Sequence, residues 1–206
     1  MSVRVVNLGL PKSGTTTLAT ALRAAGWRVA DHKLRHGEGH PAKLSGTFVG
    51  RQIYDGYFET GDPLARLDRF DALTEISGLK GARSFWPQCD FAVLKAMRVA
   101  RPGLLFVATI RPAEAISDSM RRWQGLGEER LPGGAVPGLP AGYGATDAQR
   151  VRWIAGHYDM LRDVFGDDPR FLELDVAGPD ARARLAAHLG IDLPWWGRAN
   201  VNPVRA

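Results

Sequence analysis

Residues 9–17, Gly-Leu-Pro-Lys-Ser-Gly-Thr-Thr-Thr, form the pattern with the clearest chemical meaning in this chain. An apolar, β-branched run at 3–8 precedes them and predicts a strand, and apolar residues at helical spacing follow them up to a stop signal at Gly26. A strand, a glycine-containing turn and a helix in this order leave several backbone N–H groups unpaired at the positive end of the helix. The sequence therefore predicts a loop that binds a phosphate group.

The lysine of this loop stands in an unusual place. In the common nucleotide-binding loop, G-x-x-x-x-G-K-[ST], the lysine directly follows the second glycine and the next hydroxyl holds magnesium. Here Gly9 and Gly14 have the required spacing, but Thr15 follows Gly14 and Lys12 comes earlier. The pattern disfavours an ATP or GTP enzyme. Two alternatives stay open, a kinase-like loop with a displaced lysine and a strand-to-helix turn whose small polar residues only cap the helix.

Arg111 and Ser119 are placed to bind a second anion. The continuous apolar run 104–110 predicts a strand buried on both faces of a parallel sheet, and Arg111 follows at its carboxyl end, where such sheets bind ligands. Ser119 comes eight residues later, about two helical turns along the next predicted helix, so both side chains can face one anion. Ser117 has the wrong spacing for this role.

Both patterns resemble motifs of one enzyme family. Residues 11–16, Pro-Lys-Ser-Gly-Thr-Thr, resemble the 5′-phosphosulfate loop of sulfotransferases that use 3′-phosphoadenosine 5′-phosphosulfate (PAPS), and the Arg-x7-Ser pattern at 111–119 resembles their 3′-phosphate motif. The likeness spans the chain in outline and is specific at these two motifs. It implies an enzyme that moves a sulfuryl group from PAPS to a hydroxyl or amine of a small-molecule or glycan acceptor. The product is 3′,5′-ADP, and no metal is required.

The resemblance implies a role for each matched residue. Lys12 would neutralise charge on the bridging oxygen as the sulfuryl group leaves, and Arg111 with Ser119 would hold the 3′ phosphate. The cytosolic animal enzymes usually carry tryptophan at the position of Thr17 and an Arg-Lys-Gly segment near the C-terminus. Neither is present, so the adenine contact is unassigned and Arg198 is the nearest candidate for the missing segment. The implied cofactor-binding residues of the loop are Lys12, Ser13, Gly14, Thr15, Thr16 and Thr17.

In-line transfer also needs a base that takes the proton of the acceptor hydroxyl. Family members use a histidine or glutamate beside the sulfuryl group, which implies Glu75, at the carboxyl end of the predicted strand 70–74. His32, after the predicted strand 27–30, is the rival. A surface glutamate and a capping histidine are the non-catalytic alternatives. A protein that binds phosphoadenosine but has lost the base is a third hypothesis for the whole chain.

Composition limits the class of protein. With 206 residues, 45% of them hydrophobic, the chain can bury one sizeable core, so we expect one domain over 1–206. The net charge of +5 comes mostly from scattered arginines, which suits a polyanionic small molecule, and no zinc, RNA-binding or basic heptad pattern favours nucleic acid. A single cysteine, no apolar span of about 20 residues, no leader pattern and no metal-ligand cluster predict a cytoplasmic protein without a membrane segment or metal.

Strand-like and helix-like segments alternate along the chain. This alternation predicts an α/β fold with three α/β/α layers around a central parallel sheet, and the resemblance implies a P-loop NTPase-like, sulfotransferase topology. Two segments, 34–57 and 125–144, break the alternation as long loops, and we expect the second to be a substrate lid, with a disordered surface loop as the alternative. The predicted strands are 3–8, 27–30, 70–74, 104–110 and 171–174, and the predicted helices after the first are 62–67, 87–100, 112–123, 147–165 and 179–189.

Overall fold

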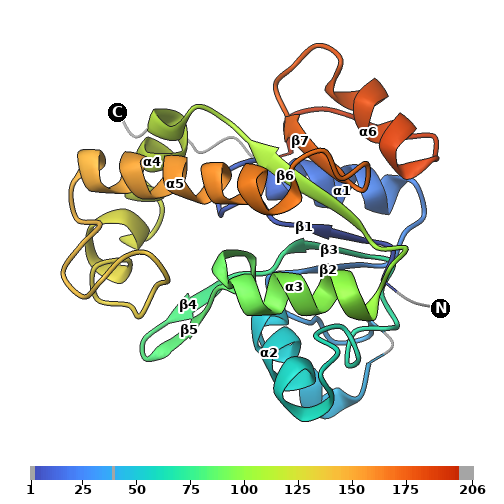
Figure 1. Cartoon of the computed structure of the whole chain (residues 1–206), viewed down its shortest axis with the longest axis horizontal. Helices are drawn as coiled ribbons and strands as arrows, with labels where there is room; N and C mark the ends of the chain where they lie inside the picture. The colour runs from blue at the N-terminus through green and yellow to red at the C-terminus, as the bar shows by residue number, and fades with distance from the viewer. Residues whose placement is uncertain (1–2, 39, 200–206) are drawn as a thin grey trace.

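The central element of the fold is a parallel β-sheet (Figure 1). A computed structural model of the chain describes residues 3–38 and 40–199. Within these residues the main sheet has five strands in the order β2-β3-β1-β6-β7, and each neighbouring pair is parallel. Every predicted strand is present, although some are shorter than expected. The strands are β1 (Val5–Asn7), β2 (Val29–Asp31), β3 (Ala72–Glu75), β6 (Leu105–Ile110) and β7 (Phe171–Asp175).

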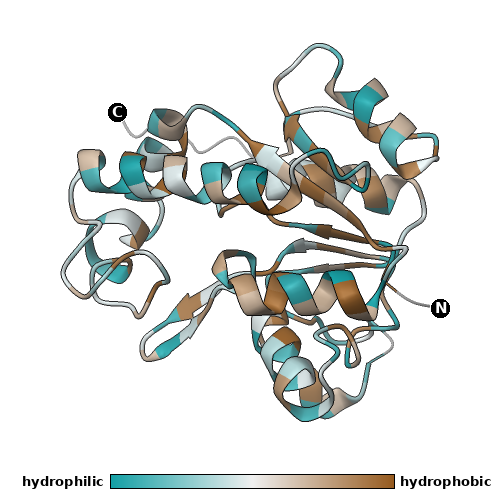
Figure 2. Cartoon of the chain, in the orientation of Figure 1, coloured by the Kyte–Doolittle hydropathy of each residue, from teal (hydrophilic) through white to brown (hydrophobic). Residues whose placement is uncertain are grey.

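Helices cover both faces of this sheet, which confirms the predicted three-layer α/β/α architecture. On one face lie α1 (Thr15–Ala24) and α6 (Ala181–Leu189). The strands of the main sheet are mostly apolar, whereas the helices carry both polar and apolar residues (Figure 2). The opposite face of the sheet from α1 and α6 carries α2 (Val49–Thr60), α3 (Phe91–Ala100), α4 (Ala113–Arg121) and α5 (Asp147–Phe165). None of the described helices is both long enough and apolar enough to cross a membrane.

Capping interactions set where two of these helices begin. At the start of α5 the Thr146 hydroxyl accepts the Gln149 N–H at 3.3 Å, and the Gln149 side chain accepts the Thr146 N–H at 3.4 Å. The predicted helix 87–100 is divided into a short 3₁₀ turn, Pro87–Cys89, and α3. The division occurs because the Asp90 carboxylate accepts N–H groups in the first turn of α3 and so caps that helix.

Helix α2 lies in a segment for which the sequence predicts a loop, so that prediction is wrong for 49–57. Gly50 and Gly56 lower the helix propensity of the segment and weaken its apolar period. The packing nevertheless requires them. A Cβ at Gly50 would lie 2.3 Å from the Ile76 carbonyl oxygen, and one at Gly56 would lie 2.9 Å from the Asp62 carbonyl oxygen. The backbone of α2 therefore approaches its neighbours too closely for a larger residue.

The predicted helix at 62–67 is also wrong, because this segment forms turns. The Asp62 carboxylate accepts the Leu64 N–H at 2.9 Å, as a helix cap does. The Leu67 N–H, however, returns to the Leu64 carbonyl oxygen after only three residues, and the segment does not continue as a helix. The same Asp62 carboxylate binds the Arg101 guanidinium at 2.6 Å and so holds the turn against the end of α3.

A two-stranded hairpin, β4 (Gly78–Lys80) and β5 (Arg83–Phe85), lies outside the main sheet. The sequence does not predict it, since strands of three residues carry too little alternation to be recognised. The hairpin packs against segment 125–144. The Ser84 hydroxyl donates to the Ala135 carbonyl oxygen at 2.7 Å, and the Arg130 guanidinium donates to the Leu79 carbonyl oxygen.

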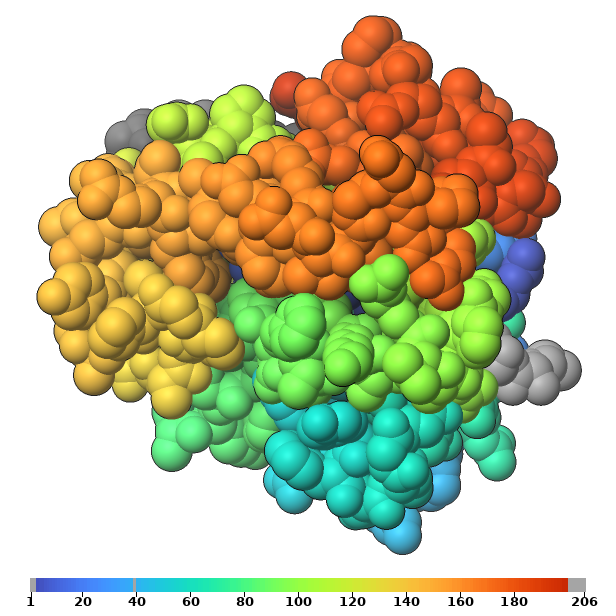
Figure 3. Space-filling model, in the orientation of Figure 1, coloured from blue at the N-terminus to red at the C-terminus, as the bar shows by residue number. Residues whose placement is uncertain are grey.

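Segment 125–144 is packed into the protein and is not a disordered surface loop. It contains a π-helical turn, Leu126–Arg130, and its apolar side chains join the core beneath α5. In the space-filling view it forms one continuous surface with α5 and the hairpin (Figure 3). Its buried apolar residues are Leu126, Leu131, Val136 and Leu139.

Arg150 joins segment 125–144 to helices α4 and α5. Its side chain is only 1% exposed. It also pairs with the more exposed Asp147. The guanidinium donates to the Ser117 hydroxyl (3.0 Å) and to the carbonyl oxygens of Gly127 (3.1 Å), Gly144 (2.9 Å) and Ala145 (2.8 Å).

We predict that Arg150→Met lowers the free energy of unfolding by about 3 kcal/mol, because it leaves the buried carbonyl oxygens of Gly127 and Gly144 without this donor. Arg152→Met, on the exposed side of the same helix, is the control and should change it by less than about 0.5 kcal/mol. Urea denaturation measures both values. Equal changes in the free energy of unfolding for the two variants would show that the Arg150 contacts do not hold segment 125–144.

Candidate functional site

The predicted phosphate loop, 9–17, begins in the connection between β1 and α1 and continues into the first turn of α1, and the side chain of Asn7 fixes its start. The buried Asn7 amide nitrogen donates to the Thr74 carbonyl oxygen at 2.8 Å and to the Thr109 hydroxyl at 3.2 Å. Its amide oxygen accepts the N–H groups of Gly9 (3.2 Å) and Thr109 (3.0 Å). Asn7 therefore joins the loop to the carboxyl-end regions of β3 and β6, the two strands that flank β1.

Helix α5 holds the loop from the opposite side. The Tyr158 hydroxyl donates to the Thr109 carbonyl oxygen at 2.8 Å and accepts the Leu10 N–H at 3.4 Å. His157 Nε2 lies 2.9 Å from the Leu8 carbonyl oxygen, and burial lowers the pKa of His157 to about 4. His157 is therefore neutral near pH 7, with the proton on Nε2, because a carbonyl oxygen can only accept.

The two glycines of the motif are required by the close packing of the loop. A Cβ at Gly9 would lie 2.3 Å from the Thr109 hydroxyl oxygen. At Gly14 a Cβ would lie 2.6 Å from the Val176 side chain, and the backbone has a φ of 117°, which favours glycine. No side chain caps α1 at Gly14, so the first N–H groups of the helix face the loop without a capping acceptor.

The polar residues of the loop differ in burial and in whether they contact other parts of the protein. Ser13 is fully buried, its hydroxyl lies 2.7 Å from the Thr109 hydroxyl, and its N–H donates to the Leu10 carbonyl oxygen at 3.1 Å. Ser13 thus supports the loop from within. Thr16 is exposed and Thr17 half-buried, whereas Thr15 is buried and lies close enough to Glu75 for its hydroxyl to stabilise the carboxylate.

Lys12 lies at the centre of a cluster of charges. Burial is the main cause that lowers the pKa of Lys12; Glu75 raises it, and Arg111 and Arg122 lower it further. The Arg111 guanidinium donates to the Lys12 carbonyl oxygen at 3.3 Å, which brings the two sequence motifs into contact. Among the described residues, neither Lys12 nor Arg111 has a carboxylate within 4 Å.

Trp123 is a residue of this cluster that the sequence does not predict. The Lys12 ammonium lies 4.8 Å from the centroid of its indole ring, and the Arg130 guanidinium lies 5.6 Å from it. A ring that attracts two cations holds both side chains at the site despite their repulsion. The only signal in the sequence is a tryptophan just beyond the helix that carries Ser119, and this does not reveal a contact with Lys12.

Glu75 lies at the end of β3, beside the loop, and is 8% exposed. Burial raises the pKa of Glu75 to about 7, although hydrogen bonds from Ser77 and Thr15 act in the opposite direction. The Ser77 N–H and hydroxyl donate to Glu75 Oε1 at 3.1 and 2.5 Å. A carboxylate with a pKa near 7 is well suited to accept and release a proton at neutral pH.

His32 lies next to Glu75, after β2, and is the second candidate base. The backbone N–H of His32 donates to the Glu75 carbonyl oxygen at 2.7 Å, and its ring nitrogen Nδ1 lies 3.1 Å from the Ser77 carbonyl oxygen. Burial lowers the pKa of His32, so the ring is neutral at pH 7, with the proton on Nδ1 and a lone pair on Nε2. The structure brings both candidates together, and Glu75 is the one coupled electrostatically to Lys12.

Arg111 and Ser119, the two candidates for binding a 3′ phosphate, are less closely connected to each other than Glu75 is to His32. Arg111 is half-buried beside the loop, and Ser119 lies on α4 and is buried, but no hydrogen bond among the described residues joins them. Ser117 has a structural role, since its hydroxyl donates to Asp147 at 2.9 Å and accepts from Arg150 at 3.0 Å. Arg198 is exposed, and no hydrogen bond within the described part of the chain joins it to the loop.

Comparison with known proteins adds no family assignment. No protein-family model matches the sequence, and no curated protein is significantly similar to it. Within residues 3–38 and 40–199, no group of three or more His, Cys, Asp or Glu side chains is arranged to hold a metal ion. The candidate residues of the site are Lys12, Glu75, His32 and Arg111.

Glu75→Gln is expected to remove a pH dependence of stability. The folded pKa of Glu75, about 7, lies above its ordinary value of 4.5, so the folded protein binds this proton more tightly than the unfolded chain. The contribution of this proton to the free energy of unfolding is complete below about pH 4.5 and is lost as the pH rises through 7. Relative to Glu75→Gln, the wild-type free energy of unfolding should fall by on the order of 3 kcal/mol between about pH 4.5 and pH 8.

Urea denaturation at several pH values measures this difference. Glu128→Gln, at an exposed position, is the control and should follow the wild type. If Glu75→Gln and the wild type show the same pH profile, Glu75 is ionised at its ordinary pKa and is not the buried acid described above.

Proposed function

We propose that this protein is a PAPS-dependent sulfotransferase that acts on a hydroxyl or amine of a small-molecule or glycan acceptor. The observation that carries the proposal is the contact between Arg111 and the backbone of Lys12, 99 residues apart in the sequence. A phosphate loop with an early lysine and an arginine suited to a second phosphate thus share one site. Two close cations without carboxylate partners among the described residues favour a ligand with several negative charges.

The order of the strands supports the proposal. The loop follows β1, and Arg111 follows β6, its parallel neighbour, with Asn7 paired to Val107. From β1 the chain moves to β2 and β3 on one side of the sheet, and then crosses to β6 on the other. Ligands of open α/β sheets bind at such a switch point, outside the carboxyl ends of the strands. We therefore propose a P-loop-like topology for this sheet.

The proposed reaction uses few protein groups. The acceptor oxygen forms a bond to sulfur while the bond between sulfur and the bridging oxygen of the 5′ phosphate breaks, and the electron pair of that bond stays on the bridging oxygen. Lys12 neutralises the charge that develops there, and Glu75 takes the acceptor proton, with His32 as the rival base. The main protein contributions are alignment and charge neutralisation. We place the reaction in the cytoplasm, where a chain with a single cysteine needs no disulfide.

A kinase-like phosphotransferase is less well supported. It would need a carboxylate that holds magnesium at the end of a buried strand next to the loop. Strand β6 is followed instead by Arg111, and the carboxylate at the end of β3, that of Glu75, has a raised pKa, which opposes ionisation. A non-catalytic phosphoadenosine-binding protein would share the two phosphate contacts and differ only in lacking the base.

The first test is ligand preference in a thermal unfolding experiment. We expect 3′,5′-ADP to raise the Tm by several degrees, 5′-AMP to raise it less, and Mg-ATP to give no larger shift than 5′-AMP, since at equal concentration the ligand that binds more tightly stabilises the folded protein more. Arg111→Gln should abolish the difference between 3′,5′-ADP and 5′-AMP.

The control is Arg121→Gln, which removes an exposed arginine of α4 that pairs with Asp118 at 3.0 Å. It should leave the order of the three ligands unchanged. A larger shift with Mg-ATP than with 3′,5′-ADP would rule out both the sulfotransferase and the phosphoadenosine-binding protein.

A further inference from the structure

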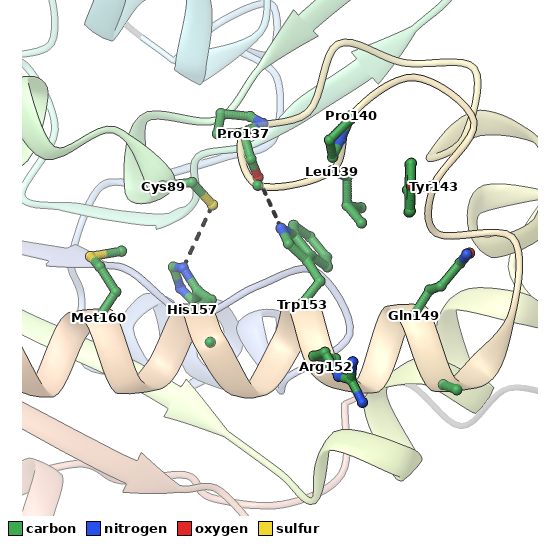
Figure 4. Close-up of a pocket in the computed structure, with 13 residues that line it drawn as sticks. Cys89, Pro137, Leu139, Pro140, Tyr143, Gln149, Arg152, Trp153, His157 and Met160 are labelled. Atoms are coloured by element: carbon green, nitrogen blue, oxygen red, sulfur yellow. Dashed lines mark hydrogen bonds between the residues drawn. The ribbon is translucent and has the colours of Figure 1, made fainter.

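A cavity of about 560 Å³ lies along α5, outside the site described above (Figure 4). One wall is the face of α5 that carries Trp153 and His157, and the other wall consists of residues 137–140, Tyr143 and Cys89. None of the proposed catalytic or phosphate-binding residues lines it. The volume falls in the range of about 300–1,000 Å³ that is usual for small-molecule sites.

The aromatic wall of this cavity is rigid. The Trp153 indole N–H donates to the Pro137 carbonyl oxygen at 2.9 Å, an interaction visible in Figure 4. Trp86 packs edge-on against the same indole, with a centroid separation of 5.7 Å and an angle of 83°. Tyr143, at 55% exposure, adds a second aromatic ring to the lining. The fixed indole of Trp153 favours a flat aromatic ligand.

The polar groups that the cavity offers are mainly hydrogen-bond donors. Gln149 uses its side-chain oxygen to accept the N–H groups of Gly144 and Thr146, which leaves its NH₂ group as the available end. Arg152 lines the cavity, and no carboxylate among the described residues lies within 4 Å of its guanidinium. A ligand with a carboxylate, sulfonate or similar anionic group would match these donors.

His157 and Cys89 complete the inner end and separate the cavity from the phosphate loop. The Cys89 sulfur lies 3.6 Å from His157 Nδ1, as the dashed line in Figure 4 marks. Burial raises the pKa of the Cys89 thiol, so it stays protonated and its S–H faces the imidazole lone pair. His157 Nε2 is occupied by the Leu8 carbonyl oxygen. The imidazole thus closes the inner wall on the side of the loop.

Gly156 keeps the cavity open along the helix. It lies in the middle of α5, where glycine is less favourable than alanine by about 0.5–1 kcal/mol. A Cβ at this position would meet no atom within 4 Å, and the residue lines the cavity. Packing against the protein therefore does not require glycine here, in contrast to Gly50 and Gly56 of α2.

We propose that this cavity binds a flat aromatic small molecule that carries an anionic group, at a site separate from the phosphate loop. The proposal is independent of the sulfotransferase assignment, because none of the residues that carry it belongs to the proposed reaction. It names Trp153 as the stacking surface, Arg152 and Gln149 as the polar partners, and Gly156 as the residue that leaves room for the ligand.

The probe for the test is 8-anilinonaphthalene-1-sulfonate, a fluorescent aromatic sulfonate. With the folded full-length chain we expect saturable one-to-one binding, which 3′,5′-ADP does not displace. Gly156→Leu should weaken binding at least tenfold by filling the cavity, and Arg152→Gln should weaken it several-fold. Ala155→Leu, the matched control, adds the same side chain at an exposed neighbouring position that does not line the cavity, and it should bind as the wild type does.

Thermal unfolding shows that each variant is folded, and leucine is favourable inside a helix, so Gly156→Leu should unfold at or above the wild-type temperature. Arg152→Gln changes an exposed side chain and provides a second test that does not depend on the core. The proposal is overturned if the wild type shows no saturable binding, if Gly156→Leu binds as tightly as the wild type, or if 3′,5′-ADP displaces the probe.

Discussion

The buried amide of Asn7 is the contact on which the arrangement of the site depends. It donates to the Thr74 carbonyl oxygen on β3 and exchanges hydrogen bonds with Thr109 on β6, while it also holds the first N–H of the loop. The ends of three neighbouring strands are thereby fixed around one side chain. Because Glu75 follows from β3 and Arg111 from β6, the same contact sets where the proposed base and the second cation lie.

The charges of the site oppose its own stability and favour a polyanionic ligand. Lys12 and Arg111 lie close together, and burial adds to the cost of keeping the Lys12 ammonium charged. Burial likewise makes ionisation of Glu75 unfavourable. Trp123 attracts both Lys12 and Arg130, which holds the cations in place without a carboxylate. A ligand with two phosphate groups would offset the repulsion, so we expect binding and folding to be strongly linked.

Short-range patterns predicted most of the fold, and long-range contacts explain what they missed. The strand at 104–110 and the helix from Thr146 carry strong local signals, and both are present. The sequence does not reveal helix α2, because Gly50 and Gly56, which allow close packing with other parts of the fold, weaken the apolar periodicity of the helix. Lys12 and Glu75, both candidate site residues from the sequence, lie close enough to interact electrostatically. Trp123 could not be placed at the site from sequence, since its contact with Lys12 exists only after α4 packs beside the loop.

The most direct test of the central claim is transfer of labelled sulfuryl from PAPS in a screen of hydroxyl and amine acceptors. We predict that the wild type labels at least one acceptor, whereas Glu75→Gln still binds 3′,5′-ADP but transfers at least a hundredfold more slowly, as expected for loss of a general base. Label transfer by Glu75→Gln at the wild-type rate would contradict the role of Glu75. If the wild type binds 3′,5′-ADP but labels none of the acceptors, the assignment of the chain as a sulfotransferase is contradicted.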